Sequence, residues 1–156
     1  MRKAMLLLAV FGLAGPLWAA DPIIGAWKLN VVKSNAQALV KERTEVYREI
    51  EGDRIELKAS EIRPDGSSSQ PPSGEGLTWP RQGGLTSRNH PMMTEEEIWV
   101  QTLIAPGHWC VTFLEKGKQV GLIHKIISKD LKTMNQLHRG IDQGKPYEAM
   151  WVFDKQ

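Results

Sequence analysis

Histidine is the residue type in this 156-residue chain whose spacing is best suited to metal chemistry, since neutral imidazoles bind zinc and copper. The four histidines are His90, His108, His124 and His138. The last three fall on successive strand-like segments, so strand register decides whether they meet. A turn that pairs Leu114 with Lys118 sets His108 opposite His124, and a slip of one residue sets them on opposite faces.

The place of His138 depends on a second turn. A loop centred on Leu131 would set His124 opposite His138. If all three histidines met, they would form a zinc or copper site, and a metal-dependent activity would be the alternative to a binding protein. No compact ligand motif accompanies them. We therefore predict no metal ion and no other cofactor.

No local motif of catalysis stands out elsewhere in the chain. The acidic run Glu95-Glu96-Glu97 reads as a solvated entry into a strand. The sequence shows no Ser-His-Asp order, no glycine-rich phosphate loop and no nucleophile elbow. Cys110 lies in an apolar run and reads as a small buried side chain, with a reactive thiol or an intermolecular bridge as the alternative. We predict a protein that is not an enzyme.

A ligand pocket is the chemistry that the aromatic residues suggest. Trp109 and Phe113 alternate onto one face of a strand-like segment, and Trp99 and Gln101 share a face of the preceding one. An apolar cavity with a few convergent polar groups is typical of a ligand site. We predict that the cavity is lined by Trp99, Gln101, Trp109 and Phe113.

The alternative is that these aromatic side chains pack against one another and leave no cavity. The protein would then act through its surface, as an envelope structural or protein-interaction module. Such a module should expose an apolar or aromatic patch, for which Trp79 and Trp151 are the candidates.

Short β-type segments separated by turn residues must position these side chains. The segments are 27–31, 44–51, 54–62, 96–104, 108–115, 119–128, 133–140 and 146–154. Helices that would make parallel crossovers are missing from the pattern between them, which favours an antiparallel meander. Closing a meander into a barrel removes its exposed edges. We predict an all-β fold, a single up-and-down antiparallel barrel of about eight to ten strands.

Two stretches depart from this rhythm. Residues 34–43 have a helix-compatible composition, which predicts either a short helix after the first strand or a plain surface connection. Residues 63–89 are rich in Gly, Ser and Pro, and a loop of that length is commonly functional or mobile. An irregular strand around 77–79 would interrupt it.

Residues 1–20 have the three parts of a secretory signal peptide. Arg2 and Lys3 precede the apolar run 5–14, and small residues follow, which places cleavage within Ala19–Asp21. The run is shorter than the roughly 20 apolar residues that span a bilayer. We expect an exported protein, periplasmic or secreted, with one domain over residues 21–156 and no transmembrane anchor after cleavage.

Charge and cysteine content narrow the possible partners. Removing Arg2 and Lys3 from the 20 basic residues leaves 18, which equals the 18 acidic residues. A net charge of zero gives no reason to expect nucleic acid as a partner. With one cysteine there is no intramolecular disulfide, so stability must come from packing. The oligomeric state and the identity of the ligand stay open.

The first strand opens with the motif Gly25-x-Trp27-Lys28-Leu29-Asn30, followed by Lys33-Ser34. This opening resembles that of small exported bacterial proteins of lipocalin-like (calycin-type) fold, most of them uncharacterised. Motifs later in the chain occur in that family's order and spacing: Lys116 to Gly121, Ser128 to Met134, Gly140 to Pro146 and Val152 to Gln156. Similar proteins usually have Gly where this chain has Leu131.

The resemblance implies that Gly25 and Trp27 form a structural motif. Trp27 would pack across the closed end of the barrel against a basic side chain from late in the chain, with Arg139 a candidate. A pocket would then lie toward the other end. The resemblance implies a fold and a small-ligand pocket but no settled activity. Together with the aromatic pattern, it predicts non-catalytic binding of a small, mostly apolar ligand in the barrel.

Overall fold

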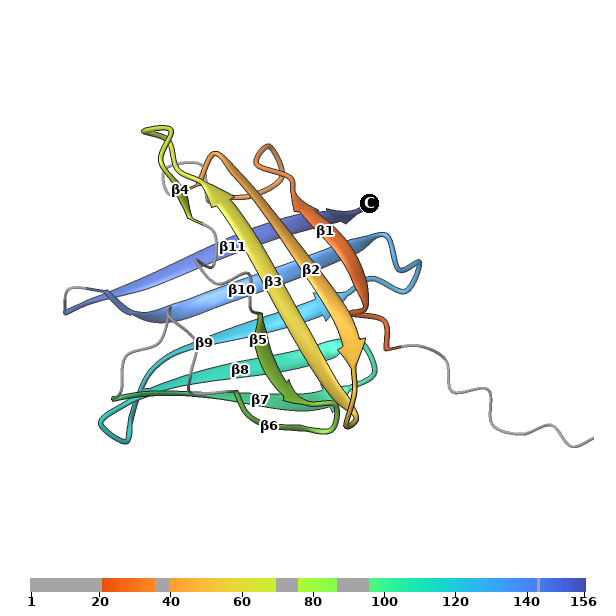
Figure 1. Cartoon of the computed structure of the whole chain (residues 1–156). Coiled ribbons are helices and arrows are strands. Elements are labelled where there is room, and N and C mark those ends of the chain that lie inside the picture. The colour runs from red at the N-terminus through yellow and green to blue at the C-terminus, as the bar shows by residue number, and fades with distance from the viewer. Residues whose placement is uncertain (1–20, 36–39, 70–75, 87–95, 143) are drawn as a thin grey trace, which may run out of the picture.

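Tight turns with positive backbone φ fold the chain into consecutive antiparallel hairpins in the computed structural model, which describes residues 21–35, 40–69, 76–86, 96–142 and 144–156 (Figure 1). Between Glu115 and Lys118, Lys116 has φ 51° and Gly117 has φ 77°. Positive φ at both central residues defines the type I′ turn, whose twist matches that of paired strands.

Eight long strands overlap the eight segments predicted from the sequence. They are β1 (Gly25–Leu29), β2 (Glu42–Ile50), β3 (Arg54–Ile62), β7 (Glu97–Ala105), β8 (His108–Glu115), β9 (Lys118–Ile127), β10 (Thr133–Asp142) and β11 (Lys145–Lys155). Three short strands bring the total among the described residues to eleven: β4 (Ser68–Ser69), β5 (Leu77–Pro80) and β6 (Gly83–Leu85). The strand expected around residues 77–79 is therefore present as β5. The all-β antiparallel fold is confirmed.

The strands form one curled sheet in the order β4-β3-β2-β1-β11-β10-β9-β8-β7-β6. Pairing of β1 with β11 joins the two ends of the described chain, with Trp27 opposite Lys155. The remaining opening lies between β3 and β7. It is spanned by β5, which pairs with β3, and by β6, which pairs with β7 (Figure 1). A short turn at Arg81 and Gln82 links these two strands.

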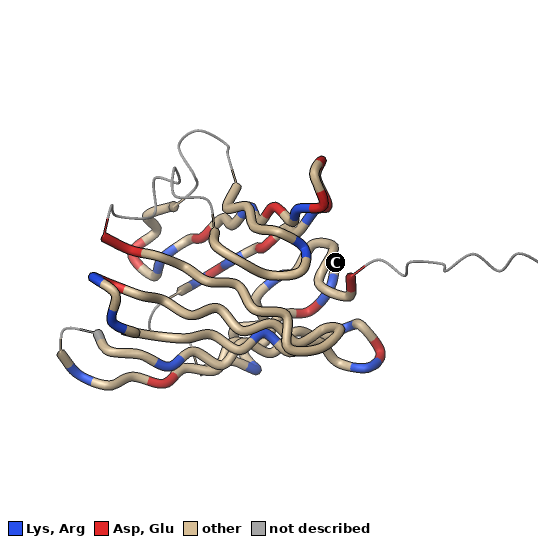
Figure 2. Tube along the Cα trace, turned by 90° about the horizontal axis from the view of Figure 1, so that it is seen from below, with Lys and Arg blue, Asp and Glu red and all other residues tan. Residues whose placement is uncertain are grey.

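The described residues contain no helix. Residues 36–39, the middle of the expected helical segment, lie outside the described residues, and β2 already begins at Glu42. The predicted signal peptide, residues 1–20, also lies outside them. In the part of the chain that is described, no helix is long and apolar enough to cross a membrane. Figure 2 shows acidic and basic residues interspersed along the trace, with neither sign gathered on one side.

One half of the barrel is filled by large side chains. The apolar and aromatic side chains with at most 1% of their surface exposed are Ile23, Trp27, Tyr47, Ile55, Trp79, Trp109, Met134 and Phe153. Trp27 Nε1 donates a hydrogen bond to the carbonyl oxygen of Ile23 at 2.8 Å. Burial of this many large apolar groups stabilises the fold without a disulfide, because each contributes roughly 1.5–3 kcal/mol.

The basic partner of Trp27 is Lys155, whose Nζ lies 5.0 Å from the centre of the ring system. Arg139, the candidate from sequence, instead pairs with Glu148 at 2.6 Å on the outer face of the sheet, so that prediction is wrong. The close approach explains the glycine of the motif. Gly25 has φ 134°, and a Cβ atom there would lie 3.0 Å from Lys155 Cε.

Candidate ligand-binding site

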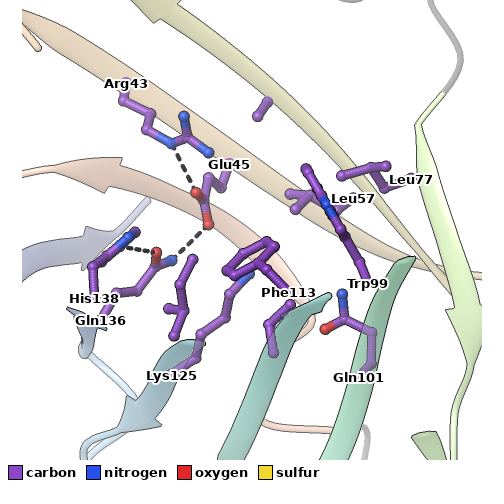
Figure 3. A pocket seen from close by; sticks show the side chains of 13 residues that line it. Arg43, Glu45, Leu57, Leu77, Trp99, Gln101, Phe113, Lys125, Gln136 and His138 are labelled. Carbon is purple, nitrogen blue, oxygen red and sulfur yellow. Dashed lines mark hydrogen bonds and ion pairs between the residues drawn. The ribbon is translucent and has the colours of Figure 1, made fainter. Parts of the chain in front are cut away.

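The barrel interior contains a cavity of about 90 Å³ that is partly open to solvent (Figure 3). Trp27 does not line it, although it pairs in register with Glu45, which does. Its apolar lining comes mainly from β3, β5, β7, β8 and β9: Leu57, Ala59, Leu77, Trp99, Val111, Phe113 and Ile123. Its polar lining comes from β2, β7, β9 and β10: Arg43, Glu45, Gln101, Lys125, Gln136 and His138. Figure 3 shows most of the polar side chains together on one side of the cavity.

Strand register explains why these residues meet. Gln136 pairs with Lys125, and His138 pairs with Ile123, across β10 and β9. Alternate residues of a strand point to the same face, so each pair places two neighbouring side chains inside the barrel. The same pleat directs Arg43, Glu45 and Tyr47 of β2 inward.

Glu45 is the centre of the polar side. Its Oε1 accepts a hydrogen bond from Arg43 Nε at 2.8 Å. Its Oε2 accepts from Tyr47 Oη at 2.5 Å and from Gln136 Nε2 at 2.7 Å. Only 1% of the Glu45 surface is exposed. A carboxylate this deeply buried is stable only with such partners, because an unpaired buried charge is very costly.

These partners decide the protonation state of Glu45. Burial alone would raise the pKa of the carboxyl group, but the charges of Arg43 and Lys125 and the hydrogen bonds of Tyr47 and Arg43 lower it to about 2. Burial and the neighbouring Glu45 charge raise the pKa of Tyr47 well above its ordinary value. Glu45 is therefore ionised and Tyr47 neutral at physiological pH.

Lys125 enters the cavity from β9 with 5% of its surface exposed. Its Nζ donates a hydrogen bond to Tyr47 Oη at 2.7 Å. Burial lowers the pKa of this ammonium group below its ordinary value, and the nearby positive charge of Arg43 acts in the same direction, whereas Glu45 opposes the shift. Lys125 is thus a buried amine that faces a cavity.

His138 extends the network on β10. Its Nε2 lies 3.2 Å from Gln136 Oε1, and because the Gln136 amide nitrogen donates to Glu45, the histidine must donate in this contact. Its ring lies 4.5 Å from that of Trp151. Burial lowers the pKa of His138 to about 4, although Glu45 opposes the shift. His138 is neutral at physiological pH.

Of the four residues predicted to bind ligand, Trp99, Gln101 and Phe113 line the cavity. Gln101 Nε2 also donates to Thr86 Oγ1 at 3.2 Å. Trp109 does not line it. It lies in the filled half with its ring 6.3 Å from that of Trp79, because alternation along β8 determines the face of a side chain but not its depth in the barrel.

Sequence reasoning missed most of the polar side. Arg43, Glu45 and Tyr47 follow the two-residue period of a strand, and this alternation with an aromatic residue is a signal that could have placed them inside. Lys125 stands between Ile123 and Ile127 on one face of its strand, which is a second signal. Polar residues are normally assigned to the outer face of a strand. Under that assumption a buried polar network is not predicted.

The three histidines His108, His124 and His138 do not meet at one point. His108 Nε2 and His124 Nδ1 lie 3.1 Å apart as diagonal neighbours on the outer face, where Cys110 is the register partner of His124. His138 faces the interior, because Leu137 and not His138 pairs with His124. Among the described residues no group of three His, Cys, Asp or Glu side chains could hold a metal ion. His90 lies outside those residues.

No family model matches this chain, and no curated protein matches it. Several solved structures do resemble it. The fluorescent protein UnaG is 12% identical and aligns with a TM-score of 0.61 over 88% of this chain and 100% of its own. The fold is of the calycin type. A mutant of UnaG is 11% identical and aligns at 0.60 over 88% of this chain and 99% of its own.

The siderocalin Ex-FABP is 11% identical and reaches a TM-score of 0.38 over 86% of this chain and 71% of its own. That similarity is too low to carry an argument. The identity to UnaG is also low, so the likeness establishes the fold alone.

Proposed function

We propose that this protein is exported and binds a small, mostly apolar ligand in its barrel without catalysing a reaction. The observation that supports binding is the cavity, in which an apolar wall from β3, β5, β7 and β8 faces a connected polar network. Cavities of this kind are typical of small-molecule sites in barrels. Export is supported by the pattern of residues 1–20.

The size of the cavity limits the ligand. A volume of about 90 Å³ is below the roughly 300–1,000 Å³ of drug-sized pockets. A ligand held here therefore places only a few atoms deep in the barrel. Because the cavity is partly open, the rest of a longer molecule extends toward solvent.

The chemistry of the polar side favours binding over catalysis. Glu45 is a weak base, because its pKa is about 2 and both of its oxygens accept hydrogen bonds from buried donors. His138 is neutral, and its Nε2 contacts Gln136. Groups engaged in this way hold a fixed geometry instead of exchanging protons with a substrate.

The alternative, a filled barrel acting through its surface, has less support. The patch residues expected for it, Trp79 and Trp151, are only 0% and 8% exposed, so that expectation is wrong. Half of the barrel is indeed filled, but the other half contains the cavity. An envelope structural or protein-interaction role remains the outcome if no ligand binds.

Intrinsic tryptophan fluorescence tests the proposal. The Trp99 ring lines the cavity and lies edge-on, 5.0 Å from Phe113. We expect a panel of straight-chain alcohols, amines and carboxylates with four to ten carbons to include molecules that shift or quench the emission saturably. Trp99→Phe should lose most of the response, whereas Trp109→Phe, a matched change in the filled half, should keep it. The absence of any saturable response across the panel would favour the filled-barrel alternative.

A further inference from the structure

We infer that the ligand carries an acidic head group, such as a carboxylate, which binds to Lys125 inside the barrel. This inference rests on the proposed function and goes beyond it by assigning the chemical class of the ligand. It starts from one observation. Lys125 is buried and lines the cavity, yet the only hydrogen-bond partner of its ammonium group among the described residues is the neutral hydroxyl of Tyr47.

The charges that line the cavity are unbalanced. They are those of Arg43, Lys125 and Glu45, two positive and one negative. Glu61 lies outside the lining, pairs with Arg43 at 2.8 Å and contacts Arg63 at 3.7 Å, so it offsets the charge of Arg43 and not that of Lys125. Glu45 in turn is bonded directly to Arg43. The described part of the chain places no carboxylate within 4.0 Å of Lys125.

Hydrogen-bond donors are also in excess. An ammonium group has three N–H donors, and that of Lys125 uses one of them on Tyr47. The indole N–H of Trp99, which also lines the cavity, is buried and has no acceptor among the described residues. Tyr47 donates its own proton to Glu45, so its oxygen is already committed. The site thus lacks acceptors and negative charge together.

A carboxylate supplies both of the missing features. Its two oxygens accept several hydrogen bonds, and its charge pairs with a buried ammonium group in a low-dielectric site, where charge-assisted bonds are strong. The apolar wall formed by Leu57, Phe113 and Ile123 would receive hydrocarbon and not a second charged group. These features favour an apolar carboxylic acid over a bare inorganic anion or a cationic amphiphile.

Three ligands that share one chain length test the head group. Octanoate, 1-octanol and octylamine are titrated calorimetrically into the purified protein at pH 7.5. We expect octanoate to bind at least about 10-fold more tightly than 1-octanol, because a hydrogen bond to a charged group contributes that much or more. Octylamine, a cation at this pH, should bind more weakly than either. Acetate, which has the head group without the chain, should bind much more weakly than octanoate.

Two lysine variants locate the contact. Lys125→Met keeps the length and apolar stem of the side chain and should weaken octanoate binding by about 10- to 100-fold while leaving 1-octanol within about 3-fold. Lys118→Met, an exposed position on the same strand, should change neither affinity. Near-ultraviolet circular dichroism checks that both variants are folded, and the comparison of the three head groups in the unmodified protein does not depend on them.

Four results would overturn the inference. If 1-octanol binds as tightly as octanoate, the acidic head group is excluded and the proposed function stands. If acetate binds as tightly as octanoate, the site takes small anions and not apolar acids. If a folded Lys125→Met protein keeps full preference for octanoate, Lys125 is not the contact. If no probe binds, the proposed function fails together with the inference.

Discussion

At the scale of single residues, the protein concentrates its buried charge in one half of the barrel. Arg43, Glu45 and Lys125 each lose hydration, and the hydrogen bonds through Tyr47 and Gln136 offset that loss. Removing one member of such a network is more damaging than replacing the whole network with apolar residues, because the partners stay buried. The network therefore fixes the geometry of the cavity wall.

His138 gives this half of the barrel a dependence on pH. Its pKa is about 4 in the folded protein against an ordinary value of 6.5, with Glu45, Lys125 and Arg43 as the charged groups around it. Between these values the unfolded chain binds more protons, so stability is full above pH 6.5 and falls as the pH drops toward 4. The loss attributable to His138 is roughly 3 kcal/mol.

Urea unfolding of the wild-type protein and of His138→Gln, followed by circular dichroism at pH 8, 6.5, 5 and 4, measures this effect. The difference in unfolding free energy between the two proteins should be constant above about pH 7. It should shift in favour of the variant as the pH falls to 4. Parallel pH profiles for the two proteins would show that His138 titrates normally.

At the scale of elements, the turns control register, and one of them is strained. Leu131, in the turn between β9 and β10, has φ 58°, a left-handed conformation that costs a residue with a Cβ atom about 1–2 kcal/mol. Its side chain is 45% exposed, so little packing depends on it. Glycine adopts this conformation at no such cost.

Leu131→Gly should therefore stabilise the protein by about 0.5–1 kcal/mol, since relief of the strain exceeds the entropy that glycine adds to the unfolded chain. The shift in the midpoint of urea unfolding measures it. Leu131→Ala removes the same side chain and keeps the Cβ atom, so it should give no comparable gain. If both variants behave alike, the backbone at residue 131 is not strained.

The same turns explain what could be predicted from sequence. Gly, Pro and Asp at the hairpins have specific backbone preferences, so the eight long strands could be located from their turns and alternation. The short strand β6 has no apolar alternation of its own and depends on pairing with β7. How deep a side chain lies in the barrel also depends on how its strand pairs with its neighbours. Trp109 is an example: its side chain points into the barrel, as predicted, but it does not reach the cavity.

At the scale of the whole molecule, the barrel divides into a filled half and a half with a cavity. Trp27 and its neighbours fill one end, and Lys155 covers the Trp27 ring. The cavity is lined by residues such as Trp99 and Lys125, whereas Trp27 stays outside the lining although it pairs in register with Glu45. The Gly-x-Trp motif therefore marks the filled part of the barrel, and ligand chemistry belongs to the cavity lining.

The indole N–H signals in a two-dimensional ¹H–¹⁵N spectrum test this division most directly, because each tryptophan contributes one signal that a Trp→Phe variant assigns. During titration with octanoate, we predict that the Trp99 signal shifts saturably and by more than those of Trp27 and Trp109, which do not line the cavity. Saturable binding that leaves the Trp99 signal unmoved, or that shifts the Trp27 and Trp109 signals as much as that of Trp99, would contradict a ligand site in this cavity.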